Sequence, residues 1–406
     1  MRPGSILIYS DAAEFGGHES MTIEAIRCLC GNTDLAVSVV FYEGNLRLQQ
    51  ELAAVASAKN LRLFPSEFQS ANLQALRSFI SPRKVSRLQQ LLKSINPDVV
   101  VVSQGRIEAG SLCLLAANRA GIRTVSYLPT AHSLKISGKP GAIRLREFVN
   151  GYLYRLPDEF ITISDGVRDM LIARGVTQKI SVVQNGIRCQ PLSDADRKHF
   201  RDELGVRNNE CLAGVLGRIE FRQKGQDFLV DTVSRFRDRL DQFKFVLVGE
   251  GPDEQQLRTM IKRASLQNKV TLLPWCENPA RVYAGLDMLL IPSKFEGVPL
   301  VMLEAMSHEL PIVASDSDGM AELLSSDWLF PFGDHNAFLE RMLDLRSLDT
   351  SESLRRNRTR VIEEFGIENF CSALSAVLLG PGDECAVGAG STRNANVRAA
   401  GAVLKS

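Results

Sequence analysis

The sequence predicts an α/β protein whose two Rossmann-like, doubly wound domains face each other across a cleft. Three observations support this fold class. The chain has 406 residues, too many for one ordinary domain and suited to two of nearly equal size. Short β-branched runs alternate with helical patterns, as in repeated βαβ units. A polar, loop-like segment near residue 190 interrupts this alternation, which then begins again.

The first domain is expected to span residues 1–188 and to contain a buried parallel sheet. Its strands are short hydrophobic runs without polar alternation, which is typical of strands covered on both faces. Helical patterns between them include Glu19–Cys30 and Pro82–Ile95. The expected strands are Ser5–Ser10, Ala36–Phe41, Val99–Val102, Thr124–Tyr127, Glu159–Ile163 and Ser181–Val183.

The second domain is expected to span residues 189–380 with the same alternation. Its last helical pattern, about Asn369–Leu379, could either close this domain or return to the first one. Residues 381–406 are rich in Gly, Ala, Ser and Asn and have little to bury, so we expect a disordered tail. The expected strands are Leu212–Leu216, Phe243–Val248, Val270–Leu273, Met288–Ile291 and Ile312–Ala314.

The composition, 45% hydrophobic and 23% charged, is typical of a soluble globular protein. The sequence shows neither an apolar run long enough to span a bilayer nor the apolar core of a signal peptide. We therefore expect a cytosolic protein whose eight cysteines are buried, reduced thiols. The pair Cys28 and Cys30 has no partner pair or nearby His, so it does not predict a zinc site.

Charge is distributed unevenly, although the net charge is only +1. Residues 1–190 contain 22 Lys and Arg against 15 Asp and Glu, whereas the remainder contains 26 against 32. The basic first half predicts that an anionic surface or substrate meets the first domain. Nucleic acid is not indicated, because no basic run is interleaved with aromatic residues.

The segment Met288–Met306 predicts a binding site for an anion flanked by hydroxyl groups. Its strand runs into a loop in which Gly297 lets the backbone approach a ligand, and Pro299 is expected as the first residue of a helix. The free N–H groups at that helix start attract anions. Two carboxylates flank the position and could accept hydrogen bonds from sugar hydroxyls, unless both are simply solvated. The expected site residues are Glu296, Gly297, Val298, Leu300 and Glu304.

A second segment supplies positive charge. Arg218 follows the strand Leu212–Leu216, and Lys224 is expected to open a helix after the loop Phe221–Gln223. Arg offers a planar fork and Lys a point charge, and both suit phosphate oxygens. Surface charge at the ends of elements is the alternative, but a position directly after a strand favours the cleft.

Two features of the first domain predict a place in the same cleft. The adjacent Gly16 and Gly17 let the loop after the first strand close over a phosphate or a sugar, with Glu19 beginning the helix. His132 follows the strand Thr124–Tyr127, at the sheet edge where such folds bind ligands. A purely structural role is the alternative for this histidine.

In this combination and order, these segments resemble the GT-B family of retaining glycosyltransferases known as family 4. The likeness covers most of residues 5–380 and is strongest from 212 to 322. The motifs that carry it are Gly16-Gly17, His132, Asn185-Gly186-Ile187, Gly217-Arg218 with Lys224-Gly225, Val248-Gly249-Glu250-Gly251-Pro252, and Phe295-Glu296-Gly297-Val298-Pro299-Leu300 with Glu304-Ala305-Met306.

The resemblance implies that a hexose-type sugar moves, with retention, from a nucleotide diphosphate sugar to a glycan or lipid-linked acceptor. No metal or other cofactor is implied. Arg218 and Lys224 would hold the diphosphate, Glu296 would contact the transferred sugar, and Glu304 would bind the ribose. His132 would lie near the reacting carbon. The other implied positions are Gly17 beside the phosphates, and Trp275 and Cys276 beside the base.

Three positions depart from the family pattern. Glu309 and Asp318 stand where members usually have Gly, and Arg188 stands where the domain junction commonly has an acid. The first two alter turns beside the donor pocket. The sequence therefore predicts the class of the donor rather than its identity.

The helix expected at Pro82–Ile95 has an apolar stripe bordered by basic residues. It is either an ordinary helix, apolar toward the sheet and basic toward solvent, or a surface that docks on an anionic membrane. Family members that act on lipid-linked acceptors often dock through this domain. The stripe is Val85, Leu88, Leu91, Leu92 and Ile95, and the bordering basic residues are Arg83, Lys84 and Arg87. A separate group of basic residues after His132, namely Lys135, Lys139, Arg144 and Arg146, adds to the positive charge of this domain.

The sequence also bears on other functions. A GT-B sugar-nucleotide epimerase would need no acceptor, and a catalytically silent nucleotide-sugar-binding partner of an assembly complex would not need an intact site. Dinucleotide binding is not predicted, because Glu254 occupies the third glycine position of the G-x-G-x-x-G pattern. A metal-dependent GT-A enzyme is not predicted, because Asp316-Ser317-Asp318 comes late in the chain.

Overall fold

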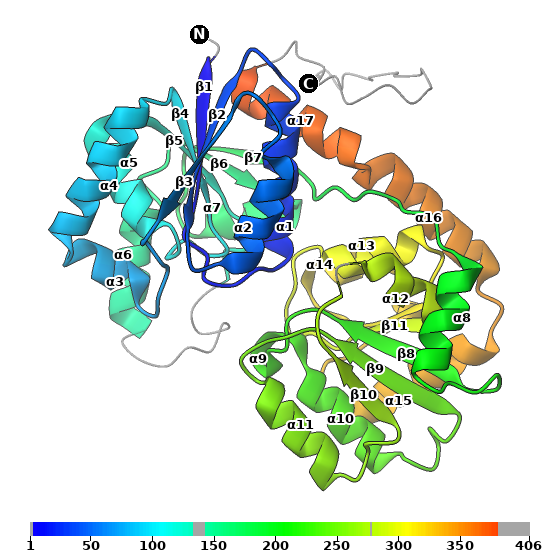
Figure 1. The fold of residues 1–406 in the computed structure, drawn as a ribbon. Helices are drawn as coiled ribbons and strands as arrows, with labels where there is room; N and C mark the ends of the chain where they lie inside the picture. The colour runs from blue at the N-terminus through cyan, green and yellow to red at the C-terminus, as the bar shows by residue number, and fades with distance from the viewer. Residues whose placement is uncertain (1–2, 133–142, 277, 381–406) are drawn as a thin grey trace, which may run out of the picture.

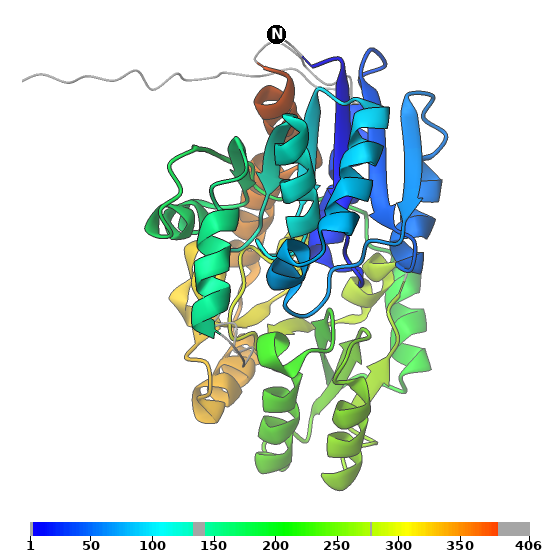
Figure 2. The same ribbon diagram turned by 90° about the vertical axis from the view of Figure 1, so that its left-hand side faces the viewer.

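The computed structural model describes residues 3–132, 143–276 and 278–380. The expected disordered tail, 381–406, lies outside the described residues, as do Lys135 and Lys139. The described chain forms two α/β domains, each built around one parallel sheet (Figure 1). This confirms the predicted fold class. In a view turned by 90° the first domain again lies above the second (Figure 2).

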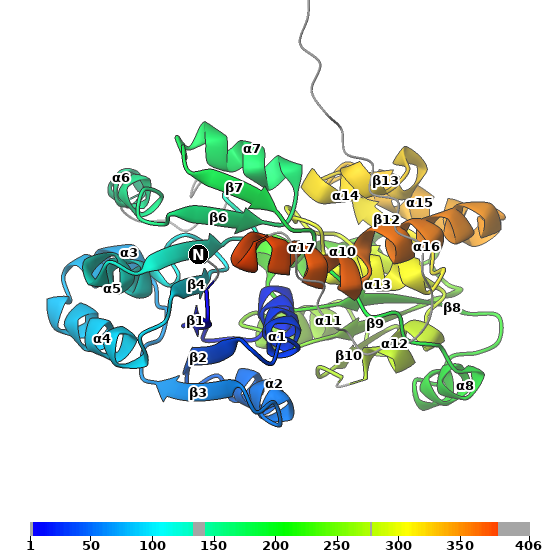
Figure 3. The same cartoon turned by 90° about the horizontal axis from the view of Figure 1, so that it is seen from above.

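The first sheet has seven parallel strands in the order β3-β2-β1-β4-β5-β6-β7. Helices α1 and α2 lie on one face and α4 and α5 on the other (Figure 3). The strands are β1 Ser5–Ser10, β2 Ala36–Tyr42, β3 Leu61–Ser66, β4 Val99–Ser103, β5 Arg123–Tyr127, β6 Glu159–Thr162 and β7 Lys179–Val182. The helices are α1 Gly17–Cys30, α2 Leu46–Val55, α3 Gln74–Phe79, α4 Pro82–Ile95, α5 Ser111–Ala120, α6 Ile143–Leu153 and α7 Asp165–Ala173.

The second sheet has six strands in the order β10-β9-β8-β11-β12-β13. The strands are β8 Cys211–Leu216, β9 Phe243–Val248, β10 Val270–Leu273, β11 Met288–Ile291, β12 Ile312–Ser315 and β13 Leu329–Phe330. The helices are α8 Asp194–Glu203, α9 Phe221–Lys224, α10 Gln226–Arg235, α11 Glu254–Arg263, α12 Pro279–Gly285, α13 Leu300–Ser307, α14 Asp318–Leu323, the 3₁₀ helix η1 Ser326–Trp328, α15 His335–Ser347, α16 Ser351–Phe365 and α17 Ile367–Leu379.

Two strands were not predicted, and both lie at a sheet edge. In β3 most residues are exposed or half buried, and Pro65 has no backbone N–H to donate to a neighbouring strand. Strand β13 has only two residues. By contrast, every residue of the central strands β4 and β8 is buried, which is why continuous hydrophobic runs identified them.

The C-terminal helices connect the two domains, and this decides an alternative that the sequence left open. Val361 and Phe365 of α16 belong to the core of the second domain, whereas Phe370 and Leu374 of α17 belong to the core of the first. The two segments that cross between the domains pair with each other, because the N–H of Ile187 donates to Phe365 O at 2.8 Å. The last helix therefore packs on the first domain (Figure 3).

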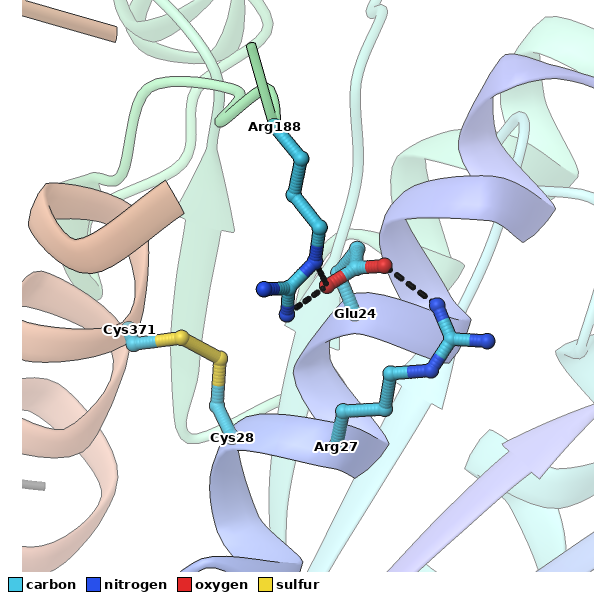
Figure 4. Close-up of a disulfide and its surroundings, with 5 residues drawn as sticks. All are labelled: Glu24, Arg27, Cys28, Arg188 and Cys371. Carbon is cyan, nitrogen blue, oxygen red and sulfur yellow. Dashed lines mark hydrogen bonds and ion pairs between the residues drawn. A yellow bond between two sulfur atoms is a disulfide. The ribbon is translucent and has the colours of Figure 1, made fainter. Parts of the chain in front are cut away.

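A disulfide joins α17 to α1. It links Cys28 and Cys371, which are 343 positions apart in the sequence (Figure 4). The expectation of reduced thiols is wrong for this pair, because the return of α17 to the first domain brings the two side chains together. Nearby, Arg188 donates to Glu24 of α1 at 2.8 and 3.2 Å, so this departure from the family pattern is used in a pair at the domain junction. Of the free cysteines, Cys189 is exposed rather than buried.

The apolar stripe of α4 is largely covered. Val85, Leu88 and Leu92 are fully buried, and α4 packs against α5. Arg146, expected among the basic surface residues, is buried and forms a bidentate pair with Glu108. These findings contradict docking through this stripe and Arg146. No helix in the described part of the chain is both long and apolar enough to cross a membrane.

Candidate active site

The loops at the carboxyl ends of the two sheets touch each other, and the residues predicted for the site gather there. A Cβ atom on Gly17, which begins α1, would lie 3.6 Å from Leu300 at the start of α13. A Cβ atom on Gly297, after β11, would lie 2.8 Å from Ile163 and 3.4 Å from Pro129 O. The 3.6 Å distance to Leu300 is ordinary van der Waals contact, whereas the 2.8 Å distance to Ile163 is too close for a Cβ atom. Gly297 therefore permits direct contact between the domains.

The loop before α13 is held by neighbours from both domains. The Asn185 side chain donates to Val298 O at 3.0 Å, across the domain junction. A Cβ atom on Gly319 would lie 2.1 Å from Gly297 O, so only glycine fits behind the loop. Among the described residues, the N–H groups of Leu300 and Val301 at the start of α13 donate no backbone hydrogen bond, whereas the N–H of Met302 donates to Pro299 O at 3.0 Å. Leu300 lies beside Gly17. An anion in this part of the cleft would meet the positive end of α13.

Lys224 and Glu296 form an ion pair. Lys224 Nζ donates to Glu296 Oε1 at 2.7 Å, and the Glu296 side chain is only 7% exposed. Gln223 also approaches this carboxylate, at 3.4 Å, and its backbone O accepts from the N–H of Lys294 at 2.7 Å. Glu296 is therefore not a solvated loop residue. Its charge is balanced by the cation predicted to bind phosphate.

Arg218 connects the two domains. Its guanidinium donates to Glu14 of the first domain at 2.9 Å and also pairs with Glu220. Its backbone O accepts from the Gln226 side chain at 2.9 Å, which places α10 behind it. Glu14 comes from the same loop as Gly16. The predicted phosphate ligand of the second domain thus lies beside the glycine loop of the first.

Glu304 is enclosed rather than exposed on its helix. The hydroxyl of Tyr283 in α12 donates to Glu304 Oε2 at 2.5 Å. Burial raises the pKa of Glu304, and this hydrogen bond offsets part of the rise. Tyr283 was not identified from the sequence. The sequence feature that could have identified Tyr283 is its aromatic hydroxyl on α12, the helix that precedes β11.

Two histidines approach the cleft from the first domain. The ring of His132 lies edge-on to the ring of Phe295, and the two ring centroids are 5.5 Å apart. Phe295 directly precedes Glu296 in the sequence. His18 is half-buried, and its Nε2 lies 2.8 Å from Ser103 Oγ. Burial lowers the pKa of His18 to about 3, so its imidazole is neutral. His18, which the sequence did not single out, holds the start of α1 against β4.

An arginine joins the predicted base-side residue to the first domain. The guanidinium of Arg47 lies 4.5 Å from the ring centroid of Phe15 and 4.5 Å from that of Trp275. Such cation–π contacts stabilise by about 0.5–2 kcal/mol. Cys276 donates to Asn278 O at 3.2 Å. Trp275 therefore lies at the domain contact, and Arg47 and Phe15 are neighbours that the sequence did not predict.

Three local details differ from the sequence-based expectation. Phe221–Lys224 is itself a short helix, and Gly225, at φ +67°, ends it before α10 begins. Pro299 is the N-cap residue, and α13 begins at Leu300. Glu309, in place of the usual family glycine, has φ +54°, a left-handed conformation that costs a non-glycine residue about 1 kcal/mol.

Among the described residues, no group of three or more His, Cys, Asp or Glu side chains could hold a metal ion. In the motif Asp316-Ser317-Asp318, the first two residues connect β12 to α14, and Asp318 is the first residue of α14.

Comparison with known proteins places two family models on the chain in succession. A model described as glycosyltransferase family 4 matches residues 15–190, and one described as glycosyl transferases group 1 matches residues 210–347. The chain is 27% identical over 258 residues to the putative colanic acid biosynthesis glycosyltransferase WcaL of Escherichia coli, covering 58% of this chain and 61% of that one. It is 22% identical over 287 residues to an E. coli UDP-Gal:α-D-GlcNAc-diphosphoundecaprenol α-1,3-galactosyltransferase, covering 68% and 73%.

Solved structures share the fold. HepE of Anabaena in complex with UDP-glucose superposes with a TM-score of 0.76 at 19% identity, covering 92% of this chain and 99% of that one. Alignments with three curated relatives cover 59%, 61% and 64% of their lengths. The chain thus spans about three fifths of the length of these relatives.

Proposed function

Because the chain belongs to the group 1 glycosyltransferases, whose two models it matches in succession, we propose that it transfers a sugar from a nucleotide diphosphate sugar to a glycan or lipid-linked acceptor. The sugar is of hexose type, and its anomeric configuration is retained. The product belongs to a bacterial surface polysaccharide or glycolipid. The names of the colanic acid and diphosphoundecaprenol relatives support this class of acceptor.

One observation supports the proposal most directly. Arg218, the Lys224–Glu296 pair and the N-terminus of α13 converge beside the glycine loop of the other domain. Two cations and a helix N-terminus match a diphosphate. Glu304, four positions into α13, reaches the ribose hydroxyls when it is ionised. His132 and Glu296 contact the sugar.

The transfer needs no protein nucleophile. The bond between the anomeric carbon and the diphosphate oxygen breaks, and a bond from an acceptor hydroxyl oxygen forms on the same face of the sugar. The acceptor's proton passes to the departing diphosphate. Lys224 leaves Glu296 to balance the new charge on that diphosphate, together with Arg218, and this electrostatic stabilisation lowers the barrier. Glu296 is then available to accept from a sugar hydroxyl.

The cations and helix amides take the place of a metal ion, so catalysis is independent of divalent metals. The test is turnover with EDTA and with added magnesium or manganese. Loss of activity in EDTA with recovery on adding metal would contradict this part of the proposal.

The enzyme acts at the cytoplasmic face of the membrane, where it binds an anionic surface reversibly. Exposed apolar side chains on α3 and α6, here called the α3–α6 patch, support this. They are Phe79 at 43%, Ile80 at 79%, Leu145 at 52%, Phe148 at 80% and Tyr152 at 47% exposed. Phe79 and Tyr152 pack edge-on at 5.5 Å, so the patch is continuous between the helices. Arg83, Lys84 and Arg144 are exposed beside it, each able to contribute about 1 kcal/mol toward an anionic leaflet.

The experiment is a thermal-shift screen with UDP-, GDP- and ADP-sugars, followed by incubation of the best donor with and without acceptor. A ligand present at about 100 times its Kd adds about 2.7 kcal/mol of stability. Transfer only in the presence of acceptor is the expected result. Epimerised donor without acceptor would indicate an epimerase. Binding without any turnover would indicate a silent nucleotide-sugar-binding partner.

A further inference from the structure

The segment that carries His132 leaves the first sheet at the end of β5. Its start is fixed, because the N–H of Leu128 donates to Ile161 O, next to β6, at 2.8 Å. Three residues later the backbone passes through Ala131, which is buried. The ring of His132 then lies against Phe295 of the second domain. The direction of the His132 side chain therefore depends on how the backbone is held at Ala131.

Arg174, at the end of α7, holds that backbone. Its Nε–H donates to Ala131 O at 2.5 Å, and a terminal N–H of the same guanidinium donates to Glu147 of α6 at 3.0 Å. The guanidinium carbon also lies 5.6 Å from the ring centroid of the buried Tyr154. The Arg174 side chain is only 17% exposed. One planar, rigid group thus joins the His132 segment to α6.

A basic residue at the end of a helix has a simpler explanation, which the contacts of Arg174 exceed. Cations at a helix C-terminus are stabilised by its last carbonyl groups and need no partner elsewhere. The hydrogen bonds of Arg174 lead instead to residues 43 and 27 positions earlier in the sequence, in other elements. Its charge satisfies the helix, but its geometry serves the neighbouring segment.

Helix α6, to which Arg174 is tied, is itself fixed to the sheet. Arg146, next to Glu147, is buried and donates to Glu108 at 3.0 and 2.7 Å. Glu108 belongs to the loop after β4, so the pair holds α6 at the carboxyl edge of the first sheet. Because α6 is anchored in this way, the Glu147 carboxylate is a fixed point from which Arg174 sets the position of Ala131 O.

We propose that Arg174 is a positioning residue for sugar transfer, which holds the Ala131 carbonyl so that His132 meets the sugar of the donor. This inference rests on the proposed function and adds a residue that contacts neither substrate. Displacing a group at the reaction centre by about 1 Å can lower the rate about 100-fold. The contacts of Arg174 described above lie within the first domain, whereas Arg218 and Lys224, assigned to the diphosphate, belong to the second.

The test is a double-mutant cycle between Arg174 and His132. Arg174→Gln removes the guanidinium and should lower kcat about 10–100-fold. In a His132→Ala background the same substitution should lower kcat no further, because the side chain that Arg174 positions is gone. Arg174→Lys offers one nitrogen in place of three and should recover part of the loss.

Binding provides a readout that needs no turnover. The Kd of the nucleoside diphosphate should be the same in Arg174→Gln and the wild type, which also shows that the variant is folded. The Kd of the intact nucleotide sugar should rise, because only the sugar meets His132. A structural role alone would weaken both ligands equally, and that result would overturn the inference.

Arg123→Gln is the matched control. Arg123 pairs with Glu159 at 3.2 Å from the first residue of β5, so its loss removes an ion pair of the same domain at the other end of the strand that leads to His132. Its kcat should equal that of the wild type. An equal loss in Arg123→Gln, or an undiminished effect of Arg174→Gln in the His132→Ala background, would overturn the inference. If the wild type transfers no sugar from any donor, the proposed function fails and the inference falls with it.

Discussion

The pair formed by Lys224 and Glu296 allows stability and catalysis to be separated in one mutant cycle. Lys224→Met keeps the length of the side chain but removes the charge. It should lower kcat by about 10²–10³, the scale for removing one preorganised donor. It should also destabilise the protein, because Glu296 is only 7% exposed and would lose its 2.7 Å partner.

The size of that destabilisation follows from the geometry. Breaking a fully buried pair costs about 3–5 kcal/mol, but Lys224 is 21% exposed, and Gln223 remains 3.4 Å from the carboxylate. We expect about 2–4 kcal/mol, or roughly 5–10 °C in the melting temperature. Adding Glu296→Gln removes the unpaired charge and should restore most of the stability but none of the turnover.

The assay combines melting curves with initial rates for wild type, both single variants and the double variant. Arg239→Met is the matched control, since Arg239 and Glu340 form an exposed pair at 2.8 Å in the same domain. Such pairs contribute about 0–1 kcal/mol. If the double variant recovers turnover together with stability, Lys224 is structural and the donor site is misplaced. Wild-type rates in Lys224→Met would refute the reasoning outright.

Three other predictions follow from single features. Because Cys28 and Cys371 form a disulfide, denatured protein that has not been reduced should have two fewer reactive thiols than reduced protein, and equal thiol counts would contradict the disulfide. Cys371→Ser should lower the free energy of unfolding by about 2–5 kcal/mol, whereas Cys189→Ser, at a free cysteine, should leave it unchanged. Because burial raises the pKa of Glu304, its carboxyl gains a proton at a higher pH than an ordinary Glu side chain, so nucleotide affinity should begin to weaken, as the pH falls, while the pH is still above the ordinary Glu pKa of about 4.3. If nucleotide affinity depends on pH in Glu304→Gln as it does in the wild type, another group causes the pH dependence. Phe148→Ser should reduce sedimentation with anionic vesicles while Ile172→Ser, also exposed, should not; equal binding to neutral vesicles would refute the electrostatic contribution.

The local sequence pattern was sufficient to predict the strands that are buried on both faces of a sheet. Val99–Val102, Phe245–Val248 and Met288–Ile291 are continuous apolar runs, and each lies in a strand inside its sheet rather than at an edge. The helix Pro82–Ile95 was predicted with its observed bounds, because proline at its start and its apolar spacing are local signals. The edge strand Leu61–Ser66 was missed, since a half-exposed strand has no continuous apolar run.

The candidate site, too, was predicted in part from the sequence and decided in part by the tertiary structure. The sequence by itself determined the order in which glycine, cation and carboxylate positions follow the strands, and from that order it predicts which side chains hold a sugar nucleotide. Only the tertiary structure decided their partners. Arg218 and Glu14 are 204 positions apart, Lys224 and Glu296 are 72 apart, and Cys28 and Cys371 are 343 apart. Such contacts depend on which loops meet across two sheet edges, and on the return of α17 to the first domain. No periodicity within one segment encodes either choice, because both are settled by burying the surfaces of elements far apart in the chain.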